Sequence, residues 1–276
     1  MEPGTGRSGC VAARSADRLY VEGCAAPACK RPMRGREGER LKALVLSDVH
    51  ANIYALEAVW SKENDSDIVY CAGDLVDYGP FPGEVIAWMR EHHAVCVQGN
   101  HDRKVAALYR QPNQLKDTPA GEWKWKHDNA GKLGEDDITF LERLPESVSF
   151  WMDGFGYRMQ HLYYKYETIE SLYQFNEYWQ SHAEEDVREA EHRRLIFGHT
   201  HRRAVHYLGD RELWLNPGSV SYRRKDDPSK DAHYMTITDG RIEMKSVEYD
   251  RSPLLAATKA TRLCAGELEA GLRFFG

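Results

Sequence analysis

Side chains able to bind metal ions recur along this chain in short segments, each placed just after an apolar run. The segments are Ser47-Asp48-Val49-His50, Ala72-Gly73-Asp74-Leu75-Val76-Asp77, Gln98-Gly99-Asn100-His101-Asp102, Gln160-His161 and Gly198-His199-Thr200-His201. They supply carboxylate, amide and imidazole groups without thiolate, a set that favours Mn²⁺, Fe or Zn²⁺ over a structural zinc cage. Two divalent metal ions could be held, and a pair of metal ions is suited to displacing groups at phosphorus.

The spacing within these segments predicts which side chains converge. Asp48 and His50 flank Val49, so on an extended strand end both would point to one side while Val49 returns to the core. His199 and His201 repeat this alternation and can face different metals. Asp74 follows a glycine that allows a tight turn, which suits a carboxylate bridging two metals.

The elements that must position these residues alternate between strand and helix in the first part of the chain. Apolar runs predict strands at 41–46, 67–71 and 94–97, and helical patterns cover 53–60 and 85–90. This alternation is typical of βαβ units with a largely parallel sheet. Ligands of such sheets gather at the carboxyl ends of the strands, where the metal-binding segments stand.

The rest of the chain predicts further strands and helices. Residues 103–146 read as helices and loops, and 167–191 as an aromatic-rich helix; we expect both segments to line the substrate side. A single helical segment is expected at 253–276, with its pattern at 254–274. The expected strands are 148–151, 157–160 and 195–197, followed by consecutive antiparallel strands at 204–208, 212–215, 233–238 and 242–248.

Composition sets limits on partners and location. The chain has 276 residues, 42% hydrophobic and 29% charged, and a formal net charge of −6. This mildly acidic balance makes nucleic acid an unlikely main partner. No run approaches the roughly 18 apolar residues of a membrane helix, and the cysteines are scattered, so we expect a cytoplasmic protein without a membrane partner. Residues 1–40 are expected to be a disordered extension, ahead of one domain at 41–252.

In type and order, the five motifs resemble the signature of the calcineurin-like metallophosphoesterase superfamily, over about residues 41–248. Leu46 to Asn52, Gly73 to Pro80 and Asn216-Pro217-Gly218-Ser219 are most similar to the small bacterial phosphoesterases of the YfcE-like type. The resemblance implies an α/β fold, a four-layer α-β-β-α sandwich in which two mixed β-sheets are flanked by helices.

The resemblance also implies a role for each site residue. His101 would protonate the leaving oxygen or stabilise charge on the phosphate, and Asp102 would orient His101. Two divalent metal ions are implied, with Mn²⁺ expected first and Fe, Zn, Ni or Co as alternatives. One metal would be bound by Asp48, His50, Asp74 and His201, and the other by Asp74, Asn100, His161 and His199.

Three positions depart from the family pattern. Leu162 follows His161 where the family usually has glycine, which makes His161 the ligand that most needs checking. Ala51 replaces a glycine, and its methyl group is expected to narrow the substrate approach. Tyr78 stands where the Ser/Thr protein phosphatases carry an arginine that grips the phosphate, which argues against a dedicated protein phosphatase.

These observations predict a dinuclear metal-dependent phosphoesterase. It would hydrolyse a phosphodiester or a small phosphomonoester through attack by a metal-bridging hydroxide. A Ser/Thr-type protein phosphatase and a dinucleoside polyphosphate hydrolase are alternatives. A non-catalytic scaffold of the same fold, similar to the retromer subunit, is the non-enzyme reading; His101 and the filled metal positions argue against it.

Overall fold

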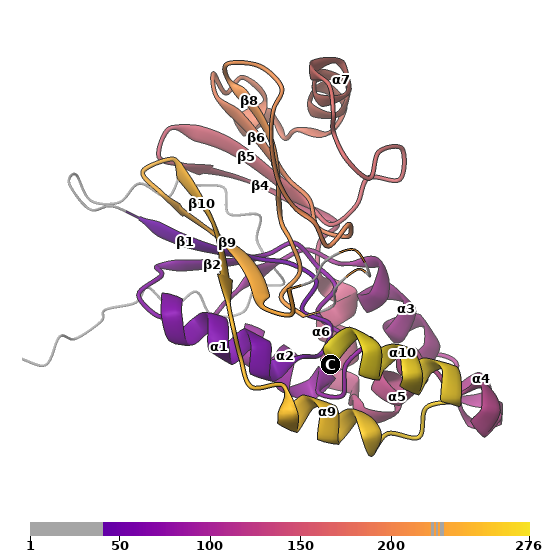
Figure 1. Ribbon diagram of the computed structural model, residues 1–276. Coiled ribbons are helices and arrows are strands. Elements are labelled where there is room, and N and C mark those ends of the chain that lie inside the picture. The colour runs from indigo at the N-terminus through magenta and orange to yellow at the C-terminus, as the bar shows by residue number, and fades with distance from the viewer. Residues whose placement is uncertain (1–40, 222–223, 225, 227–228) are drawn as a thin grey trace, which may run out of the picture.

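In the computed structural model, residues 41–221, 224, 226 and 229–276 are described, and they form two stacked β-sheets covered by helices (Figure 1). The strand order is β10-β9-β1-β2-β3 in the first sheet and β4-β5-β6-β8-β7 in the second. The extension expected at residues 1–40 lies outside the described residues.

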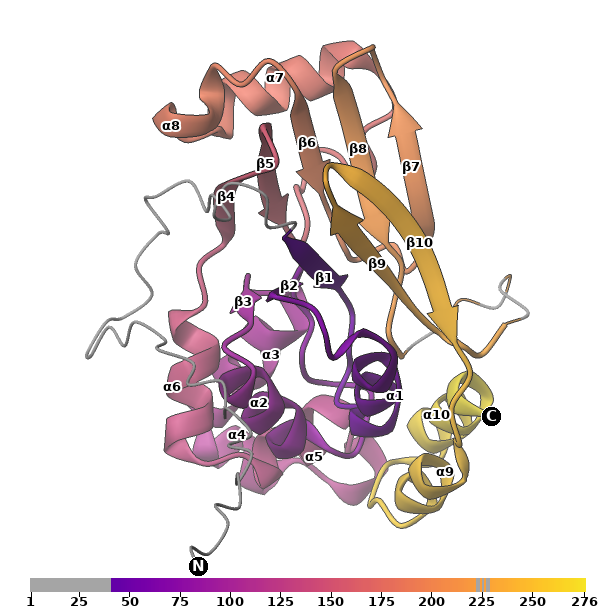
Figure 2. The ribbon, with the colours of Figure 1, turned by 90° about the vertical axis from the view of Figure 1, so that its left-hand side faces the viewer.

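The first sheet is mixed. β1, β2 and β3 run parallel, and β9 and β10 extend the sheet on the β1 side as an antiparallel pair. The bounds are β1 Lys42–Leu46, β2 Ile68–Cys71, β3 Val95–Cys96, β9 Ala232–Thr238 and β10 Arg241–Val247. The parallel β1–β2–β3 core is the arrangement that the alternating pattern predicted. Helices α1 (Ile53–Glu63) and α2 (Pro82–Glu91) connect these strands and cover one face (Figure 2).

Four further helices follow β3 and enlarge this helical layer. They are α3 Asn100–Tyr109, α4 Pro112–Asp117, α5 Trp125–Lys132 and α6 Glu135–Arg143. Apolar residues of α1, α2, α3, α5 and α6 share one core with the outward side of the first sheet. Because α3 starts directly after β3, its first turn lies at the carboxyl edge of the sheet.

The second sheet has parallel β5, β6 and β8 between antiparallel edge strands. Its strands are β4 Ser147–Met152, β5 Phe155–Gln160, β6 Arg193–Ile196, β7 Arg203–Tyr207 and β8 Glu212–Pro217. The prediction of one consecutive antiparallel run after residue 203 is therefore wrong. The chain leaves β8 at Pro217 and crosses to the first sheet before β9 begins.

The helix expected at 167–191 is two shorter helices, α7 (Leu172–His182) and α8 (Glu185–Arg188). Ser171 caps α7, because its side chain accepts a hydrogen bond from the Gln174 amide and so fixes the start of the helix. Tyr178 and Trp179 are buried against the second sheet, on the face away from the first. These aromatic residues fill a core.

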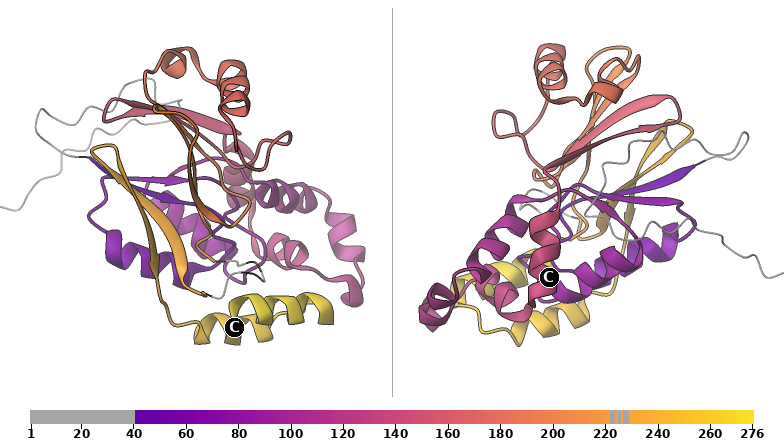
Figure 3. Two further views of the ribbon diagram at one scale, coloured as in Figure 1. Left: turned by 45° about the horizontal axis from the view of Figure 1, so that its top comes forward. Right: turned by 180° about the vertical axis from the view of Figure 1, so that it is seen from behind.

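The C-terminal segment is also divided, into α9 (Ser252–Lys259) and α10 (Ala265–Phe275). Figure 3 shows the two helices side by side at one end of the molecule. They pack on α5, where Trp125 shares a small core with Leu254 and Phe275. Among the described residues, no helix combines the length and apolar character needed to cross a membrane.

A further core, between the two sheets, holds the layers together. Val45, Val97, Met159, Ile196 and Ile237 are among its fully buried members. The four-layer α-β-β-α sandwich is confirmed by these layers. The loops that follow β1, β2 and β6 meet, because the Asp48 amide donates to the Gly73 carbonyl at 3.0 Å and the His199 amide donates to the Asp48 carboxylate at 3.1 Å.

Candidate metal centre

The loops that follow β1 and β2 are joined by their backbones. The amides of Asp48, His50 and Ala51 donate to the carbonyl oxygens of Gly73, Asp74 and Leu75 at 2.8–3.0 Å. The two loops therefore behave as one layer. Glycines allow other segments to approach this layer closely, since a Cβ on Gly99 would lie 2.1 Å from Asp74 Oδ1 and one on Gly198 2.0 Å from Ser47 Oγ.

The backbone of the candidate ligands is left-handed rather than extended. Asp48, His50, Asp74, His199 and His201 have φ values of 53°, 48°, 57°, 66° and 58°. The expectation that Asp48 and His50 alternate on a strand end is therefore wrong, although Val49 is buried in the core as predicted. Positive φ is uncommon for non-glycine residues and gathers at functional sites, where the surroundings must hold it in place.

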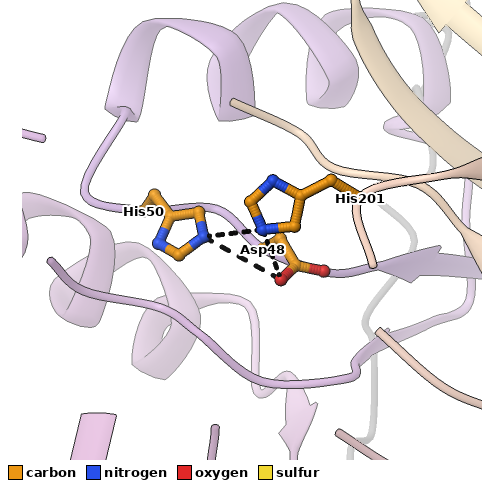
Figure 4. Close-up of side chains that lie close together, drawn as sticks. All are labelled: Asp48, His50 and His201. Atoms are coloured by element: carbon orange, nitrogen blue, oxygen red, sulfur yellow. Dashed lines mark hydrogen bonds and ion pairs between the residues drawn. The ribbon is translucent and has the colours of Figure 1, made fainter. Parts of the chain in front are cut away.

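Asp48, His50 and His201 form one group of side chains able to hold a metal ion (Figure 4). Their potential ligand atoms all lie within 4.8 Å of one another. His201 Nε2 is 3.1 Å from Asp48 Oδ1 and 3.2 Å from His50 Nε2. Ring nitrogens that face one another beside a buried carboxylate are an arrangement in which a cation would be well coordinated.

Asp74, His161 and His199 form a second group that meets the same distance condition. His161 Nε2 lies 3.2 Å from Asp74 Oδ2. Its Nδ1 donates to the Ala72 carbonyl at 2.8 Å, which leaves Nε2 directed into the site. Asn100 joins this group, because its Oδ1 is 2.9 Å from His161 Nε2 and 3.1 Å from His199 Nδ1. His161 therefore lies in the site, although Leu162 follows it where the family usually has glycine.

Asp74 lies between the two groups. Its Oδ2 is 3.2 Å from His161 Nε2 in one group and 3.9 Å from His50 Nε2 in the other. Its Oδ1 accepts a hydrogen bond from the His101 amide at 2.9 Å. The structure thus brings together all seven side chains that the sequence suggested as metal ligands, with the predicted shared carboxylate in the middle.

Electrostatics keep the carboxylates of this centre anionic although they are buried. Burial raises the pKa of Asp48, but the neighbouring His201 outweighs it and lowers this pKa to about 2. Burial likewise opposes ionisation of Asp74, and His161 brings the Asp74 pKa below its usual range. In turn, burial lowers the pKa of His161 while Asp74 raises it, to about 9. Buried anions of this kind require compensating positive charge.

His101 stands beside the two groups in the first turn of α3. Its Nδ1 is 2.6 Å from Asp77 Oδ2, and its ring centroid is 5.3 Å from that of His50. Burial lowers the pKa of His101, but the hydrogen bond to Asp77 and the charge of Asp74 raise it above its ordinary value. The residue that orients His101 is therefore Asp77.

The role predicted for Asp102 is corrected by its contacts. Oδ2 accepts hydrogen bonds from the amides of Asp74 and Gly99 at 3.0 and 2.8 Å, and Oδ1 accepts from Leu75 and Val76 at 2.8 and 3.1 Å. Asp102 thus fastens the loop after β2 to the start of α3. Burial and the charge of Asp74 raise its pKa to about 6.

Several residues support the centre without a role predicted from the sequence. Asp77 belongs to a recognised motif but received no role. Asn216 donates to the Gly198 carbonyl at 2.7 Å and contacts Thr200 Oγ1, so it holds the loop of His199 and His201. Asn129, on α5, has no motif around it and binds the loop of Asp77. The position of Asp102, three residues after Gly99 at the N-cap of α3, is typical of a capping box and could have indicated its role.

The remaining departures are resolved by burial and contacts. Ala51 is fully buried, so its methyl group does not narrow the approach of a substrate. The Tyr78 ring lies with its centroid 5.1 Å from that of His50 and 4.6 Å from that of His101. Arg103, which follows the Asn100-His101-Asp102 segment, is paired with Glu146 at 3.0 Å.

Comparison with known proteins agrees with this geometry. The family model of the calcineurin-like phosphoesterase superfamily domain matches residues 41–240. The chain therefore belongs to the calcineurin-like phosphoesterase superfamily, a metal-dependent family, and the predicted class of phosphoric ester hydrolase is confirmed.

Similar proteins include one relative found by sequence and two proteins of known structure. The uncharacterized protein MJ0912 of Methanocaldococcus jannaschii is 27% identical over 221 residues, which are 75% of this chain and 87% of that protein. A metallophosphoesterase from Sphaerobacter thermophilus has a TM-score of 0.65 at 22% identity, covering 86% of this chain and all of that one. The hypothetical protein PH1004 from Pyrococcus horikoshii OT3 has a TM-score of 0.67 at 16% identity, with coverages of 86% and 99%.

Proposed function

We propose that the protein is a dinuclear metal-dependent phosphoesterase that hydrolyses a phosphodiester or a small phosphomonoester. The observation that carries this proposal is the pair of ligand groups that meet at Asp74, with His101 beside them. One metal would be held by Asp48, His50, His201 and Asp74. The other would be held by Asp74, Asn100, His161 and His199.

The donor set fits two divalent metals. It combines two carboxylates, one amide oxygen and four imidazoles, and its carboxylates are ionised although buried. Mn²⁺ is our first candidate, because such mixed oxygen and nitrogen ligands suit it. When bound, a metal pair would lower the pKa of water at the site and neutralise charge at phosphorus.

The residues of the chain would complete the reaction. His101 would donate a proton to the oxygen of the leaving group, and the hydrogen bond to Asp77, which raises the pKa of His101, favours the protonated ring. Asp77 would hold the ring through Nδ1, so that Nε2 faces the substrate. Asp74 would fix the start of α3 through the His101 amide.

Tyr78 supports a substrate other than a phosphoprotein. Its ring stands against His50 and His101, at the position where a protein phosphatase would present an arginine. A phenol ring lacks the bidentate charged grip that a dianionic phosphomonoester on a protein requires. We therefore place diesters and small monoesters ahead of phosphopeptides.

Hydrolysis of bis-p-nitrophenyl phosphate tests the proposal. The purified full-length chain should release p-nitrophenol when Mn²⁺ is supplied and should stop when the metal is removed with a chelator. Hydrolysis that continues at the same rate after removal of the metal would refute the dinuclear mechanism. A screen of diesters, nucleotides and phosphopeptides with the Mn²⁺-loaded protein would then rank the substrate classes.

A matched variant guards this assay against contaminating hydrolases. Asp74→Asn protein, purified in parallel, should lack both activity and tight metal binding. Lys116→Ala, a change on α4 that touches none of the candidate ligands, should retain both. Equal activity in the Asp74→Asn and wild-type preparations would mean that another enzyme is responsible.

A further inference from the structure

A buried amide side chain on α5 holds the loop that carries Asp77. Asn129 is fully buried. Its Oδ1 accepts a hydrogen bond from the Asp77 amide at 2.9 Å, and its Nδ2 donates to the Gly79 carbonyl at 2.9 Å. The two bonds reach both ends of the segment 77–79, so one side chain fixes the whole loop to one helix.

The backbone of this loop needs such a restraint. Asp77 and Tyr78 are consecutive non-glycine residues with φ values of 73° and 60°. This conformation is costly for residues that carry a Cβ, and it persists only where the surroundings impose it. An amide is suited to the task because it accepts and donates at the same time, which neither a carboxylate nor an apolar side chain can do.

The loop backbone in turn sets the direction of the Asp77 carboxylate. Oδ1 accepts a hydrogen bond from the Tyr78 amide at 2.9 Å, and Oδ2 is 2.6 Å from His101 Nδ1. Rotation of the Asp77–Tyr78 peptide would therefore move the carboxylate away from His101. A chain of named contacts leads from Asn129 through Asp77 to the imidazole ring.

We propose that Asn129 is a positioning residue for His101 and acts through Asp77. The proposal deepens the function proposed above, in which His101 is the proton donor, and it gives α5 a role in the site that its sequence does not reveal. Misplacement of a reacting group by about 1 Å can cost about 10²-fold in rate. The contrasting view is that Asn129 only stabilises the fold.

Proton NMR of the full-length chain saturated with Zn²⁺ separates the two views without an activity measurement. An imidazole N–H bonded to a carboxylate at 2.6 Å should resonate far downfield of other ring protons, and loss of that signal in His101→Asn assigns it. In Asn129→Ala the signal should move upfield and exchange faster with water. Asn129→Leu, which fills the same space without the two hydrogen bonds, should show the same change as Asn129→Ala. Ile138→Val, a change in the core away from this loop, is the control for stability and should keep the signal.

Kinetics with Mn²⁺ provide the second readout. Loss of an aligned proton donor matters more for a poor leaving group, so Asn129→Ala should lower kcat about 10-fold more for phenyl esters than for p-nitrophenyl esters, with KM unchanged. Ile138→Val should change kcat by the same factor for both substrates. An unchanged downfield signal in both Asn129 variants, or equal loss for both leaving groups, would overturn the proposal.

The experiment also distinguishes this proposal from the proposed function. If the wild-type protein hydrolyses no ester and Asn129→Ala still loses the downfield signal, the positioning of His101 by Asn129 stands and the phosphoesterase function fails. If hydrolysis is normal and the signal is unchanged, the reverse holds.

Discussion

Two clusters of buried charge in this molecule have opposite designs. The first is the metal centre, made of Asp48, Asp74 and their histidines. The second is the Glu63 cluster, in which the Glu63 carboxylate lies 2.8 Å from Lys42 Nζ, 3.0 Å from Lys245 Nζ and 2.9 Å from the Tyr234 hydroxyl. Glu63 is nearly as inaccessible as Asp74. Burial of a carboxylate alone therefore does not identify a functional site.

What separates the clusters is how the charge is compensated. In the Glu63 cluster two permanent cations surround one anion, and the residues belong to a regular helix and regular strands. In the metal centre the partners are imidazoles, which are neutral or charged according to their environment, and the backbone is left-handed at most of the ligands. The metal centre is built to receive positive charge from outside, whereas the Glu63 cluster supplies its own.

The largest effect is expected when the shared carboxylate of Asp74 is removed, which tests the contrast between the two clusters. Asp74→Asn should lower Mn²⁺-dependent hydrolysis by at least about 10³-fold, because two-metal catalysis is worth several kcal/mol. Metal content by elemental analysis should fall as well. Wild-type activity in this variant would mean that Asp74 does not join the two groups.

His101→Ala should have the next largest effect. Its turnover should be lower by roughly 10²–10⁴-fold, and its metal content should be intact. Paired kinetic and elemental measurements check this result. Loss of metal in the variant would instead make His101 a ligand, and the distinction between ligands and proton donor in the centre would have to be redrawn.

Supplying metal should stabilise the folded chain. At a Mn²⁺ concentration 100-fold above the dissociation constant, the gain is about 2.7 kcal/mol per site. Thermal unfolding with Mn²⁺ or with chelator measures it. The Asp74→Asn variant should gain little, and Glu63→Gln should gain as much as the wild type. Stabilisation of Asp74→Asn to the full extent would show that the metal binds elsewhere.

Glu63→Gln should have the smallest effect, on stability only. Burial raises the pKa of Glu63, but Lys42, Lys245 and Tyr234 together bring it below the ordinary 4.5. Its contribution is therefore present above about pH 4.5 and is lost as the pH falls through the folded-state pKa. The partly exposed lysines limit the loss to about 1–2 kcal/mol at pH 7. Urea unfolding at pH 7 and at low pH should show the difference shrinking in acid, with activity unchanged.

The grouping of the candidate ligands could be predicted from the sequence better than the residues that hold them in place. The ligands could be found because each follows an apolar strand, and topology brings the ends of those strands together. Asp102 was misassigned because adjacency to His101 suggested contact, whereas side chains at successive helix positions point in different directions. Asn129 could not be found, since a single buried asparagine on a helix has no pattern in sequence. The break between β8 and β9 was missed because turn residues do not say which sheet the next strand joins.

The centre lies across the junction of the two sheets. Asp48 and Asp74 follow strands of the first sheet, while His161, His199 and His201 follow strands of the second. His50 and His201 face each other although 151 positions separate them in the chain. Metal ions bound here would act as removable cross-links, closing long loops as a disulfide does and tying the halves of the sandwich together. The activity of the site and the stability of the packing between the two sheets would then depend on the same ions.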